Sequence, residues 1–320
     1  MPTCVCNPCT HLIDWLIILL TIYFAIIHDD WGNDVKSTAI LRDMLSKEPM
    51  VVAPGAYDGI TARMIEQAGF KAVYMTGAGT AASLGYPDFG LITMTEMVEN
   101  AAKIARSISV PLISDADTGY GNELNVTRTV REFEARNVAG IHIEDQVAPK
   151  KCGHLEGKEV VSREEFLIKI RAAVAARKDP DFLIIARTDS RAVIDLDEAI
   201  ERANQALAAG ADMAFVEATQ NVEEMASVPR RVKGPCLLNM VAGGKTPIVS
   251  LKDAQDMGYR MTIMPGLLLR TAIATFDRVL HDVRESGTMK NVTPEFRIAD
   301  GFRRFGADEW DALRAPGRER

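Results

Sequence analysis

The sequence predicts an α/β protein that folds as one (β/α)8, TIM-like barrel. Eight short apolar runs alternate with amphipathic segments of helical period, an alternation typical of a parallel sheet with right-handed crossovers. Eight strands close such a barrel, and the regular part of the 320-residue chain has the usual barrel length of about 250 residues. Helical segments also end at Gly69, Gly210 and Gly258, a common C-cap signal.

The predicted elements follow one another from residue 50 onward. The strands are Met50–Ala53, Ala72–Thr76, Leu112–Asp115, Gly140–Ile143, Phe182–Arg187, Met213–Glu217, Cys236–Met240 and Arg260–Met264. The helices are Asp58–Ala68, Thr95–Ile108, Asn125–Arg136, Arg163–Arg177, Leu196–Ala209, Val222–Val228, Ser250–Met257 and Leu267–Ser286. An open, doubly wound sheet is the alternative, but its first turn would typically carry a dinucleotide glycine fingerprint, which Thr76–Gly79 matches only loosely.

The two ends of the chain depart from this pattern. We expect an atypical hydrophobic extension at residues 1–34, a barrel catalytic domain at 35–290 and a charged, helical tail at 291–320. The apolar run Trp15–Ile27 is shorter than the roughly 20 residues of a membrane-spanning helix, and no secretory signal pattern is present. Three interpretations stay open: a non-native or dispensable start, a helix that packs on a partner subunit, and a weak membrane anchor.

Composition narrows the possible partners and the compartment. The formal net charge of −7 argues against nucleic acid or an anionic membrane as the main partner, since both bind basic surfaces. The odd number of cysteines does not resemble a disulfide framework and favours a reducing, cytoplasmic location. Cys4, Cys6, Cys9 and His11 have the spacing of metal ligands, but no second cluster completes a zinc site.

Polar residues follow nearly every predicted strand. In a barrel the carboxyl ends of the strands meet at one mouth, where catalytic groups gather. The residues placed there are Tyr74, Thr76, Gly77, Ala78, Asp115, Asp117, Glu144, Asp145, Arg187, Asp189, Glu217, Asn239 and Arg270. Asp88, on the loop after the second strand, can reach the same mouth. This convergence predicts one shared active site.

The acids of the third and fourth strands suggest a metal site. Asp115 and Asp117 are two apart on an extended segment, so both carboxylates can face the mouth, and Glu144 joins them from the next strand. Mg²⁺ suits such oxygens because it takes one or two carboxylates, keeps waters and accepts substrate oxygens; Mn²⁺ is a possible substitute. Three acids without a cation would repel one another. The alternative is that the aspartates are helix caps or turn residues.

The segment Lys150–His154, with sequence KKCGH, combines charge, a thiol and a proton carrier. Its lysines and His154 are expected to lower the pKa of Cys152, and the glycines give the loop the freedom of a lid. The prediction is a thiol that acts as acid or nucleophile on a mobile loop, and the alternative is a small residue among solvated lysines. Asp145 is expected to be a structural partner at its strand end.

Two further groups are expected to bind a carboxylate. Arg187 is a fixed cation that can clamp a carboxylate through two hydrogen bonds, with a salt bridge inside the barrel mouth as the alternative. The N–H groups of Thr76, Gly77 and Ala78 can also bind a carboxylate, because glycine lets a ligand approach the main chain.

Seven segments resemble the isocitrate lyase and phosphoenolpyruvate mutase superfamily, from about Asp34 to Thr288. They are YMTGAG, SLGYPDFG, DADTGYG, HIEDQ, PKKCGH, ARTD and NM followed by GGKTP. The resemblance is greatest to short lyases of the 2-methylisocitrate and 2,3-dimethylmalate type, with oxaloacetate hydrolases and decarboxylases nearby. Phosphoenolpyruvate mutases lack the Cys-Gly-His of the loop, so Cys152 favours carbon–carbon lyase chemistry.

The resemblance implies roles for single residues. The catalytic set is Cys152, Tyr74, Glu144 and His154, and the metal set is Asp115, Asp117 and Glu144. The substrate-binding set is Thr76, Gly77, Ala78, Asp88, Lys150, Gly153, Arg187, Glu217, Asn239 and Arg270. The resemblance also implies a barrel whose last helix swaps between subunits of a homotetramer, a dimer of dimers. This chain departs from the family at Ala242, where relatives commonly carry Glu.

The expected function is Mg²⁺-dependent retro-aldol cleavage of a 2-hydroxy di- or tricarboxylate to a 2-keto acid such as pyruvate and a second carboxylate. Tyr74, Glu144 or a metal-bound water are open as the general base. The alternative reactions are oxaloacetate hydrolysis or decarboxylation and mutase chemistry on phosphonates. The alternative of another class is an inactive barrel that binds a dicarboxylate.

Overall fold

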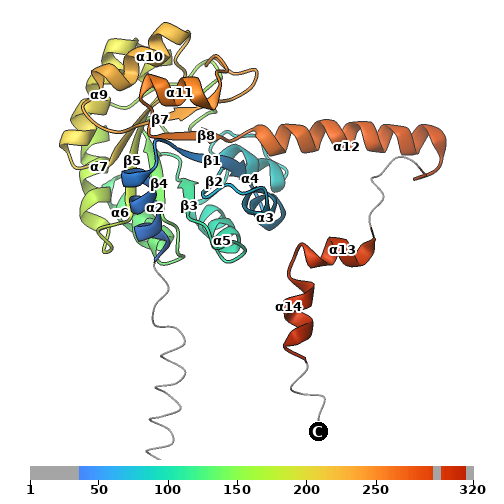
Figure 1. Ribbon diagram of the computed structural model, residues 1–320. Helices are drawn as coiled ribbons and strands as arrows, with labels where there is room; N and C mark the ends of the chain where they lie inside the picture. The colour runs from blue at the N-terminus through green and yellow to red at the C-terminus, as the bar shows by residue number, and fades with distance from the viewer. Residues whose placement is uncertain (1–35, 291–296, 315–320) are drawn as a thin grey trace, which may run out of the picture. The chain divides into compact units, whose positions relative to one another are not determined.

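The computed structural model describes residues 36–290 and 297–314. Its eight strands are all parallel and form a closed barrel in which β8 returns to pair with β1 (Figure 1). The predicted (β/α)8 fold is therefore confirmed, and the open sheet is excluded. Residues 1–35 lie outside the described part of the chain, so the three interpretations of the N-terminal segment and its cysteines stay predictions.

All eight predicted strands are present, with ends that differ by at most a few residues. They are β1 (Val51–Ala56), β2 (Val73–Met75), β3 (Leu112–Asp115), β4 (Gly140–Glu144), β5 (Leu183–Thr188), β6 (Met213–Val216), β7 (Cys236–Asn239) and β8 (Met261–Met264). Every residue of β3 to β7 is buried, because helices cover the outside and side chains fill the inside.

The predicted helices also form. They are α3 (Gly59–Gln67), α5 (Met94–Ala105), α6 (Glu123–Glu134), α7 (Arg163–Ala176), α9 (Leu196–Ala208), α10 (Val222–Arg231), α11 (Leu251–Met257) and α12 (Leu267–Ser286). Their first turns are fixed by side-chain caps. Asp58, Thr93 and Ser250, for example, each accept a hydrogen bond from a backbone N–H three residues later.

Three helices were not predicted from the sequence: α2 (Ser37–Lys47), α4 (Gly77–Ser83) and α8 (Ser190–Val193). Helices α13 (Ile298–Arg303) and α14 (Ala307–Ala312) lie within residues 291–320, for which a charged, helical tail was expected. Helix α2 matters most, because its buried Leu41 and Met44 pack on the inward-facing residues of the strands. Arg42 holds α2 in place through an ion pair of 2.8 Å with Asp212, just before β6. The helix therefore closes the barrel at the end opposite the active site.

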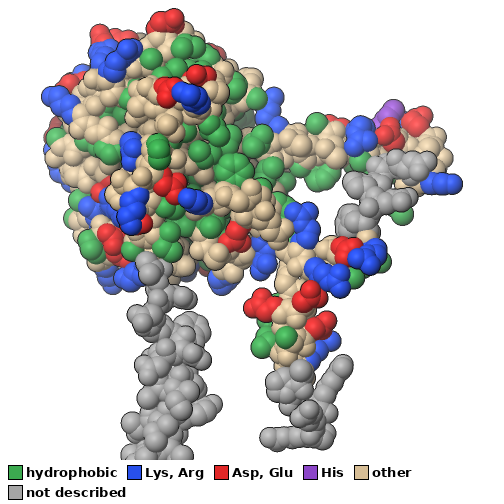
Figure 2. Space-filling model, viewed as in Figure 1, with side chains coloured by type: hydrophobic (Ala, Val, Ile, Leu, Met, Phe, Trp, Pro, Cys, Tyr) green, Lys and Arg blue, Asp and Glu red, His purple; other side chains and the backbone are tan. Residues whose placement is uncertain are grey.

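Helix α12 is the unusual element of the barrel domain. It has 20 residues and none of them is buried. Ile273, Phe276 and Leu280 are each about half exposed or more, and hydrophobic side chains are visible along the helix (Figure 2). No helix in the described ranges is long and apolar enough to cross a membrane.

Candidate active site

A pair of aspartates forms the floor of the site. The backbone N–H of Asp117 donates to Asp115 Oδ1 at 3.0 Å, and Gly77 N–H donates to Asp115 Oδ2 at 3.2 Å. Burial would raise the pKa of Asp115, but His142, which is protonated in the acid range where Asp115 titrates, and the charges of Lys150 and Arg187 lower it to about 2. Burial raises the pKa of Asp117 to about 6 despite Lys150, and Asp115 adds to the effect. The two carboxylates therefore repel each other, and a cation would stabilise both.

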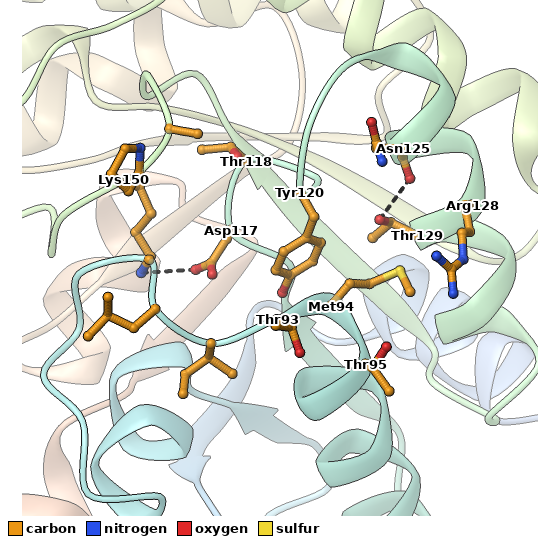
Figure 3. Close-up of a pocket in the computed structure, with 15 residues that line it drawn as sticks. Thr93, Met94, Thr95, Asp117, Thr118, Tyr120, Asn125, Arg128, Thr129 and Lys150 are labelled. Carbon is orange, nitrogen blue, oxygen red and sulfur yellow. Dashed lines mark hydrogen bonds and ion pairs between the residues drawn. The ribbon is translucent and has the colours of Figure 1, made fainter.

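The buried Lys150 ammonium joins this floor to the loop after β2. Its Nζ lies 2.5 Å from Asp88 Oδ1 and 2.9 Å from Asp117 Oδ1. Figure 3 shows the ammonium pointing at the Asp117 carboxylate, with the ring of Tyr120 beside them. These residues also border an open cavity of about 600 Å³ on the Asp117 side. Lys150 is thus fixed between two carboxylates and is not a freely solvated lysine.

The aspartate pair fits a metal ion, whereas a complete ligand set is not assembled. In the described part of the chain, no three His, Cys, Asp or Glu side chains converge as metal ligands do. A Cβ on Gly77 would lie 2.5 Å from Asp115 Oδ2 and 3.5 Å from Asp117 Oδ1, so both carboxylates border one small space. Both Glu144 carboxylate oxygens are buried without a hydrogen bond, and Asp117 Oδ1 has only its ion pair with Lys150. Such hard, unsatisfied oxygens are what Mg²⁺ binds.

Arg187 lies at the centre of a buried network of carboxylates. Its guanidinium lies 3.0 Å from Asp189, 3.1 Å from Glu144 Oε2 and 3.4 Å from Glu217. The contact with Glu144 is an ion pair without hydrogen-bond alignment, which is why the Glu144 oxygens remain unsatisfied. The guanidinium also stacks 5.1 Å from the centre of the Phe215 ring. The salt bridge that was the alternative prediction for Arg187 is present. The side chain also lines a second cavity, of about 180 Å³, which is described below with the lid.

Tyr74 is held by a neutral histidine. Its hydroxyl lies 2.7 Å from His142 Nε2, and burial lowers the pKa of His142 to about 4. Burial also raises the pKa of Tyr74 well above its ordinary value. A phenolate is therefore strongly disfavoured near neutral pH, so Tyr74 suits a donor of hydrogen bonds better than a base.

Asp145 has the structural role that the sequence predicted for it. Its carboxylate accepts hydrogen bonds from the Thr188 hydroxyl at 2.6 Å and from Asp189 N–H at 2.8 Å. Arg202 adds an ion pair at 3.0 Å. The carboxylate faces α9 and the end of β5, whereas the neighbouring Glu144 faces Arg187.

A lid, defined here as residues 147–160, covers the mouth. Its base is closed by the antiparallel bridge between Gln146 and Val160. On one side Cys152 N–H donates to the Asp88 carbonyl at 3.2 Å. On the other side His154 Nδ1 accepts a hydrogen bond of 3.1 Å from Lys245 N–H, and its Nε2 lies 3.5 Å from Glu217. The lid is therefore docked on the loops that follow β2 and β7.

The expected lowering of the Cys152 pKa is wrong. Burial raises the pKa of this thiol, and the hydrogen bond from the backbone of His154 only partly offsets the effect. Lys150 does not lower the pKa of the thiol, because its ammonium is paired with the carboxylates of Asp88 and Asp117. Lys151 does not lower it either, because its side chain is exposed to solvent. A thiol with a raised pKa keeps its proton near neutral pH, so the structure favours an acid over a nucleophile.

The predicted substrate residues share one cavity of about 180 Å³. It is lined by Tyr74, Thr76, Ala78, Asp88, Asp115, Lys150, Cys152, Gly153, His154, Arg187, Glu217, Asn239 and Arg270. Gly77, Asp117 and Glu144 do not line it; Gly77 contacts Asp115, and Glu144 lies behind Arg187. Thirteen of the predicted residues thus converge from distant parts of the sequence.

The apolar wall of this cavity was not predicted from the sequence. Val241, Pro265, Gly266 and Leu269 complete the lining, after β7 and β8. Only their positions just beyond a strand could have indicated them, since apolar residues carry no chemical signal. Ala242, the departure from the family, does not line this cavity but a neighbouring apolar one of about 350 Å³.

Replacing Gly153 by alanine is expected to lower kcat/KM about 10²-fold, because displacing a catalytic group by about 1 Å has an effect of this size. The added Cβ would lie 2.5 Å from Arg187 Nη2, 2.7 Å from Glu217 Cγ and 2.9 Å from Asp189 Oδ1. The lid could then dock only if buried charged groups moved. Steady-state kinetics and thermal melting measure the two effects, and the melting temperature should hardly change. Leu155→Ala, at an exposed lid position, is the control; wild-type kinetics for Gly153→Ala would contradict the account.

The fold and the site define a class of protein, a barrel enzyme with an acid pair, a buried arginine and a thiol on a docked lid. Comparisons with known proteins agree. The family described as phosphoenolpyruvate phosphomutase matches residues 41–284. The 2,3-dimethylmalate lyase of Eubacterium barkeri is 52% identical over 232 residues, 72% of this chain and 80% of that protein. The 2-methylisocitrate lyase of Aeropyrum pernix is 46% identical over 253 residues, 79% of this chain and 82% of that protein.

Solved structures are similar over nearly the whole barrel. Oxaloacetate acetylhydrolase in complex with 3,3-difluorooxalacetate has a TM-score of 0.85 at 38% identity, covering 88% of this chain and 97% of that one. A 2,3-dimethylmalate lyase has a TM-score of 0.84 at 40% identity, covering 89% and 97%. Phosphonopyruvate hydrolase in complex with oxalate and Mg²⁺ has a TM-score of 0.80 at 29% identity, covering 88% and 99%.

The chain therefore belongs to the phosphoenolpyruvate mutase and isocitrate lyase superfamily. The resemblance inferred from the sequence motifs is confirmed. The named lyases among its relatives also confirm the predicted class of enzyme, a carbon–carbon lyase.

Proposed function

We propose that this protein cleaves a 2-hydroxy di- or tricarboxylate, of the 2,3-dimethylmalate or 2-methylisocitrate type, to pyruvate and a second carboxylate. The observation that carries the proposal is that Cys152, a proton-bearing thiol on a docked lid, lines the same small cavity as the buried Arg187. The similarity to lyases with these substrates supports the choice of substrate class.

The reaction is a retro-aldol cleavage of the bond between C2 and C3. The hydroxyl proton at C2 leaves, the C2–C3 bond breaks, C2 becomes the ketone of pyruvate, and C3 takes up a proton. Glu144 is proposed to take the hydroxyl proton, because its two buried carboxylate oxygens make no hydrogen bond and can accept one. Cys152 supplies the proton to C3, and the docked lid excludes water that would compete for the carbanion.

Mg²⁺, or Mn²⁺ in its place, is proposed as the cofactor, held by Asp115 and Asp117 with Glu144 nearby. Its chemistry would be Lewis-acid stabilisation of negative charge on the substrate oxygens. Arg187 adds a fixed positive charge beside the same cavity. Arg270, at the mouth, has no carboxylate partner in the described part of the chain and is proposed to bind the substrate's second carboxylate.

The proposed assembly is a homotetramer, a dimer of dimers, in which α12 packs on a neighbouring subunit. A 20-residue helix with no buried residue and with exposed Ile273, Phe276 and Leu280 is expected to be covered in the working protein. Sedimentation equilibrium would test this, and a monomer at micromolar concentration would contradict it. A cytoplasmic location is part of the proposal, since a reducing compartment keeps thiols such as Cys152 free.

Removal of the metal tests the cofactor directly. Protein dialysed against EDTA and then freed of chelator is expected to lose nearly all activity towards the hydroxy acids and to regain it with Mg²⁺ or Mn²⁺. The substrates to compare are 2,3-dimethylmalate, 2-methylisocitrate, isocitrate, oxaloacetate and phosphonopyruvate. Full activity in metal-free protein would contradict the assignment, and turnover of oxaloacetate alone would favour the hydrolase alternative, to which the acetylhydrolase likeness points.

A further inference from the structure

A lysine outside the cavity makes an unusual contact with the lid. Lys158, on the returning arm of the lid, is only 9% exposed. Its ammonium donates to the Gly153 carbonyl and, at 2.9 Å, to the Leu155 carbonyl. These two acceptors lie on either side of His154 in the chain. The ammonium therefore ties the returning arm of the lid to its tip.

Burying the positive charge of Lys158 lowers the stability of the fold. Within the described ranges no carboxylate lies within 4.0 Å of its Nζ, so two neutral carbonyls are its nearest partners. Burial lowers the pKa of Lys158, and the more distant Asp189 and Glu217 only partly offset this. An apolar side chain of the same length would avoid the cost of desolvating a charge. The ammonium is therefore better explained by what it positions than by stability.

The lid tip that Lys158 holds has little freedom to move without affecting the site. Gly153 packs against the buried Arg187, Glu217 and Asp189, which leaves no room for a Cβ. The flanking residues are Cys152 and His154, and both line the substrate cavity. Lys158 itself does not line it. A shift of the Gly153 carbonyl would thus displace the thiol and the imidazole together.

A second fastening holds the other arm of the lid. The side chain of Gln146 donates to the Lys151 carbonyl at 2.9 Å and accepts from Lys151 N–H at 3.0 Å. Gln146 is almost fully buried and carries no charge. The two arms are therefore fixed by different groups, and Lys158 is the one next to Gly153 and His154.

We propose that Lys158 is a positioning residue that keeps the lid docked, with Cys152 over the cavity and His154 against the loop after β7. It acts through the Gly153 and Leu155 carbonyls and touches no substrate. The inference rests on the proposed function for its catalytic consequence. The docking itself does not depend on which reaction the protein catalyses.

The test compares Lys158→Met with Lys151→Met. Lys151 is a matched control because it is an exposed lysine of the same lid, and its ammonium donates to one carbonyl, that of Gly157, at 3.2 Å. Each purified full-length variant, without substrate, is treated with iodoacetamide, and labelling of Cys152 is followed by peptide mass spectrometry so that other cysteines do not interfere. Lys158→Met is expected to label at least several-fold faster than the wild type, and Lys151→Met at the wild-type rate.

The direction of this change separates positioning from electrostatics. Removal of a positive charge near a thiol raises the pKa of the thiol and slows alkylation, so faster labelling requires a displaced lid. Lys158→Arg, which keeps charge and donors, is expected to restore much of the protection. With the substrate in hand, kcat of Lys158→Met should fall about 10²-fold with a nearly unchanged melting temperature.

Two outcomes would overturn the proposal: Cys152 labelling in Lys158→Met at the wild-type rate, or the same acceleration in Lys151→Met. Faster labelling in Lys158→Met alone, with no activity on any hydroxy acid, would support the lid inference while the proposed function failed. If Lys158→Met does not fold, Lys158→Gln, which keeps a donor but no charge, is judged by the same two outcomes.

Discussion

Cys152→Ser is expected to lower kcat by about 10²–10⁴-fold, the usual contribution of a general acid, with little change in KM. The serine hydroxyl is nearly the size of the thiol but is a much weaker acid, so the carbanion at C3 is left without its proton donor. Steady-state kinetics with the substrate from the screen measure the loss. Cys236→Ser is the control, since Cys236 is a buried cysteine of β7 that does not line the cavity, and it should reduce stability instead of kcat.

The pH dependence of wild-type activity also tests the role of Cys152 as a general acid. A raised pKa means that the thiol of Cys152 remains protonated to higher pH than an ordinary cysteine, whose pKa is about 8.5. Activity should therefore persist through neutral pH and fall only on the alkaline side of that value. If activity already fell as the pH was raised towards 8, and this fall was absent in Cys152→Ser, the acid role of Cys152 would be contradicted. A Cys152→Ser enzyme with more than half of the wild-type kcat would also contradict it.

Asp115→Asn is expected to abolish tight metal binding and to lower kcat/KM by about 10²–10⁴-fold. A Lewis-acid metal stabilises the charge of the transition state by several kcal/mol, and this stabilisation would be lost. Asp115 accepts one hydrogen bond on each oxygen, from Asp117 N–H and from Gly77 N–H, so an amide of nearly the same size keeps one of these bonds and loses the charge. Titration with Mn²⁺, followed by electron paramagnetic resonance, measures the loss of binding without reference to activity.

Asp145→Asn is the matched control for this variant. Asp145 is equally buried and follows Glu144 directly, but its carboxylate faces Arg202 and Thr188. Asp145→Asn should lower the melting temperature, because the buried Arg202 keeps only Glu198 of its two carboxylate partners, while Mn²⁺ binding is retained. Equal loss of Mn²⁺ binding in both variants would mean that general disruption, and not the ligand at Asp115, explains the effect.

The sequence was a good guide to everything that depends on periodicity. Strands β3 to β7 are buried along their whole length, and their apolar runs ended close to the observed boundaries. Polar residues just beyond those runs then had to meet at one mouth, because parallel strands of a barrel all end at the same rim. This geometric constraint explains why residues as distant as Asp88 and Arg270 were placed together correctly.

What the sequence could not supply was the sign and strength of interactions between distant residues. Neighbouring lysines suggested an activated thiolate at Cys152, but Lys150 is engaged by Asp88 and Asp117, and burial of the thiol decides its pKa. Helix α4 was missed because its glycine-rich start is a poor helix former, and Thr76 caps it. The role of Lys158 depends on a buried ammonium, which no local pattern indicates.

The central claim is best tested by following 2,3-dimethylmalate and 2-methylisocitrate, each with the Mg²⁺-loaded protein in D₂O, by ¹H NMR. The account predicts that one of them gives equimolar pyruvate and a second carboxylate, propionate or succinate respectively, that carries one deuterium at the former C3. It also predicts that Cys152→Ser forms these products far more slowly. Cleavage of neither compound, together with hydrolysis of oxaloacetate to oxalate and acetate, would contradict the claim.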